Sequence, residues 1–291
     1  MQNKTHAFLI LAHNNPTHLV RFLRALESSN HYFFVHIDKK SKDDFSELKN
    51  ISNCFFIKKK VSCNWGGFSL VKATLNLLKY AYFSGHFSYF HLLSGADYFC
   101  STNKKFDVFF NNTNQSFLSI SDSTPFEWRL KIYTFNDIIN RRGKWKNILW
   151  HTDDIQRKLI KHFKIRKELQ ERFYYGSQWF SLSHDIVHYV LKFCKTNPQF
   201  VRRFYLTFVP DESFFHMIIM NSPLAHKITQ NNLRFIDWKR KIPQEPLPRT
   251  LDIEDYDDIV KSGSFFCRKV SQPKSAELLD KLDELRKDEQ I

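Results

Sequence analysis

The stretch THAFLILAHNNPTHLVRFLRALESSNHYFFVHID, residues 5–38, decides the fold class. Its apolar run over 5–12 ends in a polar turn, which is typical of a buried strand. Pro16 then begins a predicted helix in which Leu19, Leu23 and Leu26 recur at helical spacing. A second strand is predicted over 32–38. Because strand, helix and strand follow one another, the stretch predicts parallel strands joined by a helical crossover.

The same alternation continues along the chain. We predict further strands over 54–57, 89–93, 116–120 and 176–182, and helices over 67–83, 103–110, 185–196 and 275–290. The expected fold class is α/β, with a mostly parallel central sheet flanked by helices, a basic helical insertion and a C-terminal helix.

Four polar segments lie at or near the predicted carboxyl ends of strands: 13–14, 36–38, 64–67 and 94–97. Ligands of open α/β sheets bind beyond these strand ends. We therefore expect the four segments to line one crevice.

The composition excludes several classes of protein. Of 291 residues, 42% are apolar and 30 are Phe, which predicts a large core. The 7 glycines form neither G-x-G-x-x-G nor a P-loop, so both common nucleotide-binding motifs are absent. The 5 cysteines include no C-x-x-C, and no secretory signal or long apolar run occurs. These features predict a reduced, cytoplasmic protein.

Positive charge is concentrated in one segment. The chain has 44 Lys and Arg against 30 Asp and Glu, and eleven basic residues lie within 141–172 against four acidic ones. Nucleic acid, an anionic membrane or a phosphorylated substrate would each suit this segment. Ile155, Leu159 and Phe163 predict an amphipathic helix there. Either it lies on something anionic, or its apolar side packs on the core.

Several residues could carry chemistry, and each has a structural alternative. Glu212, in Pro210-Asp211-Glu212, is either a favourable acid at a helix start or a general base. Trp238 and Trp179 are either sugar-stacking platforms or packed rings. Arg249 and Lys269 either neutralise a diphosphate or are surface charges.

Metal ligation is not expected. The one D-x-D lies in a late acidic stretch with no strand before it, and the His184/His188 pair lacks the Glu of a zinc protease.

Six segments in order resemble one family: WGGFSL (65–70), HLLSGADY (91–98), GSQW (176–179), PDESFF (210–215), NLRFIDWKRK (232–241) and FFCRK (265–269). The family is glycosyltransferase family 14, the core-2/I-branching β-1,6-N-acetylglucosaminyltransferases, which includes the peptide O-xylosyltransferases. The resemblance covers residues 5–270. Gln178 stands where the xylosyltransferase-like pattern has Asp, which puts peptide xylosylation in doubt.

The resemblance implies a GT-A-like fold and an inverting transfer from a UDP-sugar to an acceptor hydroxyl without a divalent metal. It implies one domain, 1–291, with a nucleotide-binding half (1–122), an acceptor and catalytic half (123–270) and a C-terminal helix (271–291). By position, Glu212 is the expected base. The expected donor contacts are His13, Asp38, Trp65, Asp97, Arg249 and Lys269, and the expected substrate contacts are Glu127, Arg129, Gln178, Trp179 and Trp238.

We expect UDP-GlcNAc as donor, with UDP-xylose as the alternative, and a bacterial surface glycan such as lipopolysaccharide or capsule as acceptor. A lipid-linked acceptor would give the basic segment an anionic membrane as its partner, at the inner face of the cell membrane. Two rival hypotheses are a basic nucleic-acid-binding protein, for which no binding signature is present, and a family member that binds sugar nucleotide without transfer.

Overall fold

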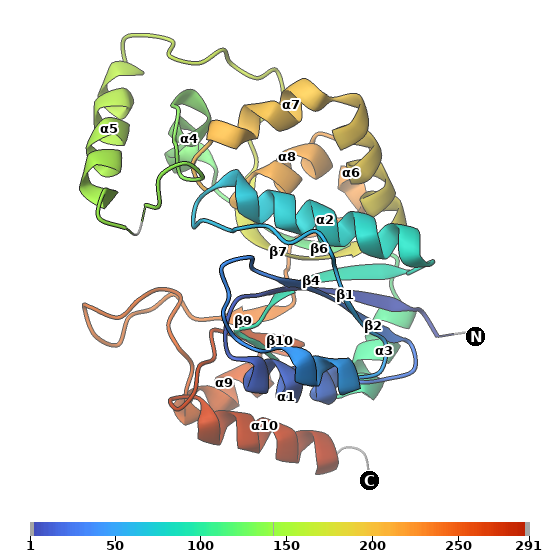
Figure 1. The fold of residues 1–291 in the computed structure, drawn as a ribbon. Helices are drawn as coiled ribbons and strands as arrows, with labels where there is room; N and C mark the ends of the chain where they lie inside the picture. Colours follow the sequence, from blue (N-terminus) through green and yellow to red (C-terminus); the bar gives the residue numbers. More distant parts are fainter. Residues whose placement is uncertain (1–2, 142, 289–291) are drawn as a thin grey trace.

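The central sheet of the protein has seven strands in the order β3-β2-β1-β4-β7-β6-β8 (Figure 1). A computed structural model describes residues 3–141 and 143–288. The strands are β1 (His6–Ala12), β2 (His31–Ile37), β3 (Cys54–Phe56), β4 (Tyr89–Ser94), β6 (Ser116–Ser121), β7 (Tyr175–Ser183) and β8 (Ile228–Thr229). The strands from β3 to β4 pair in parallel, as do β6 and β8. Among the strands of the described residues in this sheet, β7 alone runs antiparallel to its neighbours, so the mostly parallel sheet is confirmed.

Helices cover both faces of this sheet (Figure 1). One face carries α2 (Phe68–Ser84), α6 (His184–Thr196), α7 (Pro198–Arg203) and α8 (Phe214–Met220). The other carries α1 (Pro16–Leu26), α3 (Asn103–Asn111), α9 (Tyr256–Lys261) and α10 (Ala276–Asp288). Alternate residues of β1 supply the two cores, since Phe8 and Ile10 face one layer while Ala7 and Leu9 face the other. The predicted α/β class is therefore confirmed, and the predicted elements are present with ends within two residues wherever the structure describes them. Positions 289–290 of the last predicted helix lie outside the described residues.

A second, three-stranded sheet was not predicted. It has the order β5-β10-β9, formed by β5 (Asp97–Phe99), β10 (Phe266–Arg268) and β9 (Arg234–Ile236). Because β9 and β10 are parallel, the residues that follow them, Asp237-Trp238 and Lys269, leave the sheet at the same end. Asp97, at the start of the antiparallel strand β5, pairs with Arg268 at that end too.

The basic insertion between β6 and β7 holds α4 (Trp128–Lys131) and α5 (Lys146–Leu159), which stands at the outer edge of the molecule (Figure 1). Leu149 and Asp153 are its buried residues, and Asp153 forms an ion pair of 2.5 Å with the buried Arg141. Ile155, Leu159 and Phe163 are 45%, 43% and 67% exposed. The alternative that packs this apolar side on the core is therefore wrong. Among the residues that the structure describes, none of the helices combines the length and the apolar character that a transmembrane span requires.

Candidate active site

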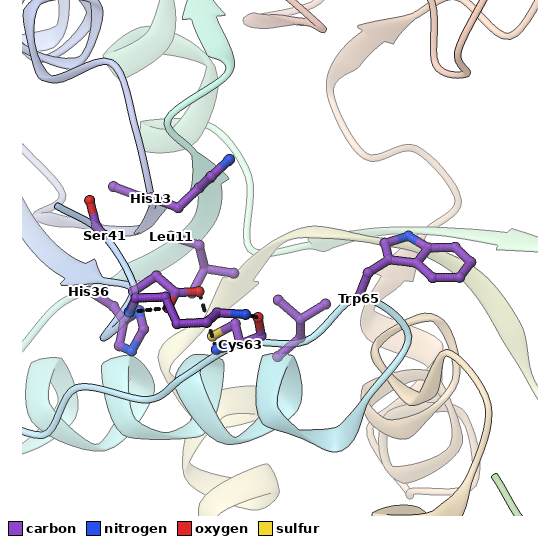
Figure 2. A pocket seen from close by; sticks show the side chains of 10 residues that line it. Leu11, His13, His36, Ser41, Cys63 and Trp65 are labelled. Atoms are coloured by element: carbon purple, nitrogen blue, oxygen red, sulfur yellow. Dashed lines mark hydrogen bonds between the residues drawn. The ribbon is translucent and has the colours of Figure 1, made fainter. Parts of the chain in front are cut away.

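A cavity of about 350 Å³ opens where β1 and β2 end, as predicted from their polar tails; we call it the strand-end cavity (Figure 2). The turn before α2 closes one side of it. Its lining residues are Leu11, Ala12, His13, His36, Asp38, Lys40, Ser41, Cys63, Trp65 and Leu70. The predicted donor contacts His13, Asp38 and Trp65 therefore meet in one place. The fourth predicted segment, 94–97, does not line this cavity.

Asp38 is held by backbone groups rather than by a cation. Its Oδ1 accepts a hydrogen bond of 2.8 Å from the amide of Lys40, and its Oδ2 accepts one of 3.2 Å from the amide of Cys63. His36 Nε2 accepts a bond of 2.9 Å from the amide of Val61, which fits the lowering of the His36 pKa by burial. These bonds fasten the 61–64 loop to the end of β2 and leave each Asp38 oxygen with lone pairs for a ligand.

Asp97 and Trp179 lie beneath the surface instead of lining a cavity. The Asp97 carboxylate is fully buried and bonds to the amide and hydroxyl of Ser94 and to the Arg268 guanidinium. That guanidinium stacks on the buried Trp179 ring, 4.2 Å from its centroid. Both residues therefore hold Arg268, which links the small sheet to the end of β4. In the structure Asp97 and Trp179 thus position Arg268, and their predicted donor and substrate contacts stay predictions.

A second cavity of about 350 Å³ contains Glu212 and Trp238, and we call it the Glu212 cavity. Its other lining residues are Ser119, Ser121, Tyr175, Gly176, Ser177, Asn232, Arg234 and Ile236. Two further predicted substrate contacts lie outside this lining. Gln178 is half-buried on β7, and the exposed Glu127 forms an ion pair of 3.2 Å with Lys131.

Glu212 is fixed by an arginine. It lies in the 3-10 turn Pro210–Glu212, ahead of α8 rather than within it. Arg129 Nη1 donates a bond of 2.8 Å to Glu212 Oε2, and this guanidinium is buried against the rings of Phe126 and Tyr175 at 4.6 and 4.9 Å. Burial first, and the charge of Glu212 second, raise the pKa of Tyr175 to about 12, so its phenol stays protonated. Arg129, predicted as an acceptor contact, thus positions the carboxylate.

Asp211, beside Glu212, differs from it in burial. Burial, and to a smaller extent the negative charge of Glu212, raise the pKa of the Asp211 carboxyl to about 7. The folded protein therefore keeps a proton on Asp211 between about pH 4 and 7, whereas the unfolded chain releases it. The stability contributed by this group falls as pH rises through that window.

We expect Asp211→Asn to remove the decrease in the free energy of unfolding that Asp211 causes as pH rises. Between pH 5 and 8 the free energy of unfolding of the wild type should fall by about 2–3 kcal/mol relative to Asp211→Asn. Urea denaturation of both proteins at the two pH values measures the difference. Equal pH dependence in the two proteins would contradict a raised pKa at Asp211.

Gly176, on β7 at the wall of the Glu212 cavity, lets the backbone of β6 lie close beside it. A Cβ atom at this position would lie 1.9 Å from the carbonyl oxygen of Ser119 and 2.9 Å from Nε2 of His216. The obstruction includes backbone of the paired strand, so a rotamer change cannot relieve it. Glycine is thus required here by space.

We expect Gly176→Ala to lower the free energy of unfolding by about 2–3 kcal/mol, because β6 and β7 must separate to admit the methyl group. Gly85→Ala is the matched control, since its Cβ would meet only Phe87, at 3.5 Å. Urea denaturation of both variants tests this, and equal stabilities would refute the steric argument.

Hydrogen bonds link the turn that carries Trp65 to the segment just before Glu212. The amide of Val209 donates a bond of 3.0 Å to the carbonyl of Gly66, and Asn136 Nδ2 donates one of 2.6 Å to the same oxygen. Gly66 adopts a positive φ of 72°, which favours glycine. Trp65 directly precedes Gly66, and Glu212 lies three residues after Val209, so the hydrogen bond between Gly66 and Val209 holds their two segments together.

Arg249 is surrounded by carboxylates. Its Nη2 donates a bond of 2.7 Å to Asp237 Oδ2, and its Nη1 donates one of 2.9 Å to Asp255 Oδ2. Hydrogen bonding to Asp255 raises the pKa of this buried guanidinium above its usual value. The amide of the exposed Lys269 donates to the carbonyl of Arg249 at 3.4 Å. The two predicted diphosphate residues are thus adjacent, but the charge of Arg249 is already balanced within the protein.

Sequence reasoning missed Tyr175, Arg234, Lys40 and Asp211 as parts of the site. Tyr175 adjoins Gly176-Ser177 and Asp211 adjoins Glu212, so proximity to a motif was the available signal. Arg234 is buried at the wall of the Glu212 cavity, and burial lowers its pKa to about 9; its Nη2 donates to the carbonyls of Leu92 and Phe180. No sequence pattern predicts such burial.

Comparison with known proteins agrees with the resemblance. The xylosyltransferase 2 of Rattus norvegicus is 26% identical over 301 residues, which cover 95% of this chain and 33% of that protein. The xylosyltransferase 1 of Rattus norvegicus is 25% identical, over 81% of this chain and 28% of its own length. The xylosyltransferase 1 of Homo sapiens is 26% identical, with 81% and 24% covered. The chain thus spans about a third or less of these relatives.

Among solved structures, a Bacillus anthracis protein assigned as a glucose-1-phosphate thymidylyltransferase, in complex with a sucrose, is similar with a TM-score of 0.31 and 13% identity. The match covers 70% of this chain and 85% of that one.

The family model described as Core-2/I-Branching enzyme matches residues 6–260, which include every strand named above except β10. Both cavities lie within this range, and Lys269 lies outside it. The chain therefore belongs to the core-2/I-branching enzyme family of glycosyltransferases.

Proposed function

We propose that the protein is an inverting glycosyltransferase that moves a sugar from a UDP-sugar to an acceptor hydroxyl. UDP-GlcNAc is the first donor proposed, and UDP-xylose is the alternative. The observation that carries the proposal is the position of Glu212. Its carboxylate opens into a cavity beside the exposed Trp238, next to the turn that leads to the strand-end cavity.

In the proposed reaction, the acceptor oxygen attacks the anomeric carbon from the face opposite UDP. The bond from this carbon to the diphosphate oxygen breaks, and its electron pair leaves with UDP. Glu212 takes the proton of the acceptor hydroxyl. Arg129 keeps the carboxylate in place before attack, and Trp238 offers its ring to an acceptor sugar.

The strand-end cavity is the proposed nucleotide site. The free lone pairs of Asp38 suit an N–H of uracil, and His13 and Trp65 line the same cavity. We propose that Lys269 offsets diphosphate charge without a divalent metal. In this proposal Arg249 holds the loop that presents Trp238, rather than contacting the diphosphate directly.

The test is UDP release from UDP-GlcNAc, UDP-xylose, UDP-glucose and UDP-galactose, each with and without EDTA. The proposal expects release from one donor that EDTA does not slow. A loss of activity in EDTA that Mg²⁺ or Mn²⁺ restores would contradict metal-free transfer. UDP binding by calorimetry without turnover, even with glycan acceptors, would favour a member that binds sugar nucleotide only.

The exposed side of α5 supports a membrane-bound acceptor. Ile148, Ile155 and Leu159 on α5 are exposed, as are Trp145 just before the helix and Phe163 just after it, and we call these five residues the α5 apolar face. Lysines surround this face within the basic segment, including Lys144, Lys146, Lys158, Lys161 and Lys164. Such a combination fits an anionic bilayer surface. We therefore propose a lipid-linked glycan as acceptor, at the inner face of the cell membrane.

We expect the protein to sediment with vesicles containing phosphatidylglycerol at low salt, and much less at high salt. Replacing Ile155 and Leu159 by Ser should lower the bound fraction several-fold. Val108→Ser, at an exposed position on α3, is the matched control. No sedimentation of the wild type would refute the membrane proposal, and salt-sensitive RNA or DNA binding without UDP binding would favour the nucleic-acid rival.

A further inference from the structure

Three polar side chains outside both cavities converge where β1 and β2 begin, at the opposite edge of the sheet from the strand-end cavity. They are His6 and His31, the first residues of β1 and β2, and Asp107 on α3. Asp107 Oδ1 lies 3.1 Å from His31 Nε2 and 3.8 Å from His6 Nε2. All three atoms lie within 4.8 Å of one another.

The hydrogen bond made by the other ring nitrogen of His31 fixes the tautomer of its neutral ring. His31 Nδ1 lies 2.7 Å from the carbonyl oxygen of Leu26, which can only accept, so Nδ1 carries a hydrogen. In the neutral ring, His31 Nε2 then carries no hydrogen, and its lone pair faces Asp107 Oδ1 at 3.1 Å. Two acceptors at this distance repel each other unless a positive charge lies between or beside them.

His6 contributes a third electron-pair donor atom, its Nε2. Its ring is completely buried, and its Nε2 has no hydrogen-bond partner among the described residues. His6 Nδ1 lies 3.0 Å from His91 Nε2, and His91 Nδ1 lies 2.9 Å from the hydroxyl of Ser181. When each histidine donates toward Ser181, His6 Nε2 is left with its lone pair aimed at Asp107.

We propose that His6, His31 and Asp107 bind one divalent transition metal ion of the zinc class. Bond lengths of about 2.0–2.2 Å place neighbouring ligand atoms of a tetrahedral zinc about 3.3 Å apart, close to the 3.1 Å and 3.8 Å separations here. Water would take the fourth position, since the Asp107 side chain is 17% exposed. The set of two imidazoles and one carboxylate is chemistry that zinc accepts.

The surrounding hydrogen bonds have the form that metal sites use. Each histidine has a partner for its second nitrogen, Leu26 or His91, and Asn30 Nδ2 donates a bond of 3.0 Å to Asp107 Oδ1. Such partners fix the tautomer of each ring and orient the carboxylate. The metal would tie β1, β2 and α3 together and would take no part in sugar transfer.

The test begins with wild-type protein dialysed against EDTA and then titrated with Zn²⁺ by calorimetry. The proposal expects one Zn²⁺ per chain at a Kd of about 1 µM or tighter, with a rise in Tm of about 5 °C or more. Co²⁺ should give the visible absorption of a four-coordinate site. No binding by the wild type at 100 µM Zn²⁺ would overturn the proposal in favour of a doubly protonated His31 paired with Asp107.

Variants locate the ion. Asp107→Asn and His31→Gln should each weaken Zn²⁺ binding by at least about tenfold, and Asp185→Asn, at a carboxylate on α6, should not. Unchanged affinity in both variants would place the ion elsewhere and overturn the assignment, and the wild-type titration stands even if a variant fails to fold. UDP release by the EDTA-treated wild type separates the two proposals, because sugar transfer without Zn²⁺ leaves the proposed function intact whether or not the metal site exists.

Discussion

Replacing Glu212 by Gln is expected to lower kcat by about a hundredfold or more while leaving UDP binding intact. An amide keeps the shape of the side chain, and its oxygen still accepts the Arg129 hydrogen bond, so the turn should stay folded. The amide cannot take the acceptor proton, however, and general base catalysis contributes about 10²–10⁴ in rate. Steady-state turnover with saturating donor and calorimetry with UDP measure the two effects separately.

Glu47→Gln is the matched control for this experiment, because Glu47 is an exposed glutamate outside both cavities and its ion pair with the exposed Arg24 is long, at 3.9 Å. Its kcat should equal that of the wild type. If Glu212→Gln also turned over at the wild-type rate, the base would have to be sought at another group. If neither protein transferred sugar but both bound UDP, the idle family member would be favoured.

Replacing Arg249 by Met is expected to lower the free energy of unfolding by about 3–5 kcal/mol. The change leaves Asp237 and the buried Asp255 without the cation that balances them. The loop that carries Trp238 should lose its order first, because Asp237 adjoins that residue. Urea denaturation measures the loss, and Arg24→Met is the control, since exposed pairs contribute only about 0–1 kcal/mol.

A second variant separates this role from diphosphate binding. Adding Asp237→Asn and Asp255→Asn to Arg249→Met removes the uncompensated charges and should recover much of the lost stability. If Arg249 instead served the diphosphate directly, the single variant would keep its stability and raise the KM for the donor at least tenfold. That result would refute the structural role given to this residue here.

The strands and the strand-end cavity were predictable because their signals are local. Apolar runs such as 5–12 mark buried strands, and Pro16 marks the first helix. His13 and Asp38 follow neighbouring parallel strands, so their meeting at one edge follows from the topology. Glu212 and Trp238 were brought together by the family resemblance, since nothing in their spacing joins them.

The remaining features depend on contacts between distant residues. Arg249 is balanced by Asp255, which was read from sequence only as part of an acidic stretch. Trp179 is buried because Arg268, 89 positions later, covers its ring. The outward turn of Ile155 and Leu159 follows from the buried Arg141–Asp153 pair, which sets the rotation of α5. A hydrophobic pattern alone does not distinguish a helix face that packs on the core from one that is exposed on the surface.

The basic insertion leaves and re-enters the sheet at one place, because Ser121 at the end of β6 is paired with Tyr175 at the start of β7. Segments whose ends lie this close can be exchanged with little strain on the scaffold. The insertion also contains Arg129, which donates a hydrogen bond to Glu212. Replacing the insertion between Ser121 and Tyr175 by that of another family member would therefore exchange the proposed acceptor-binding segment together with Arg129, the residue that holds Glu212. The strand-end cavity proposed for the donor would stay unchanged.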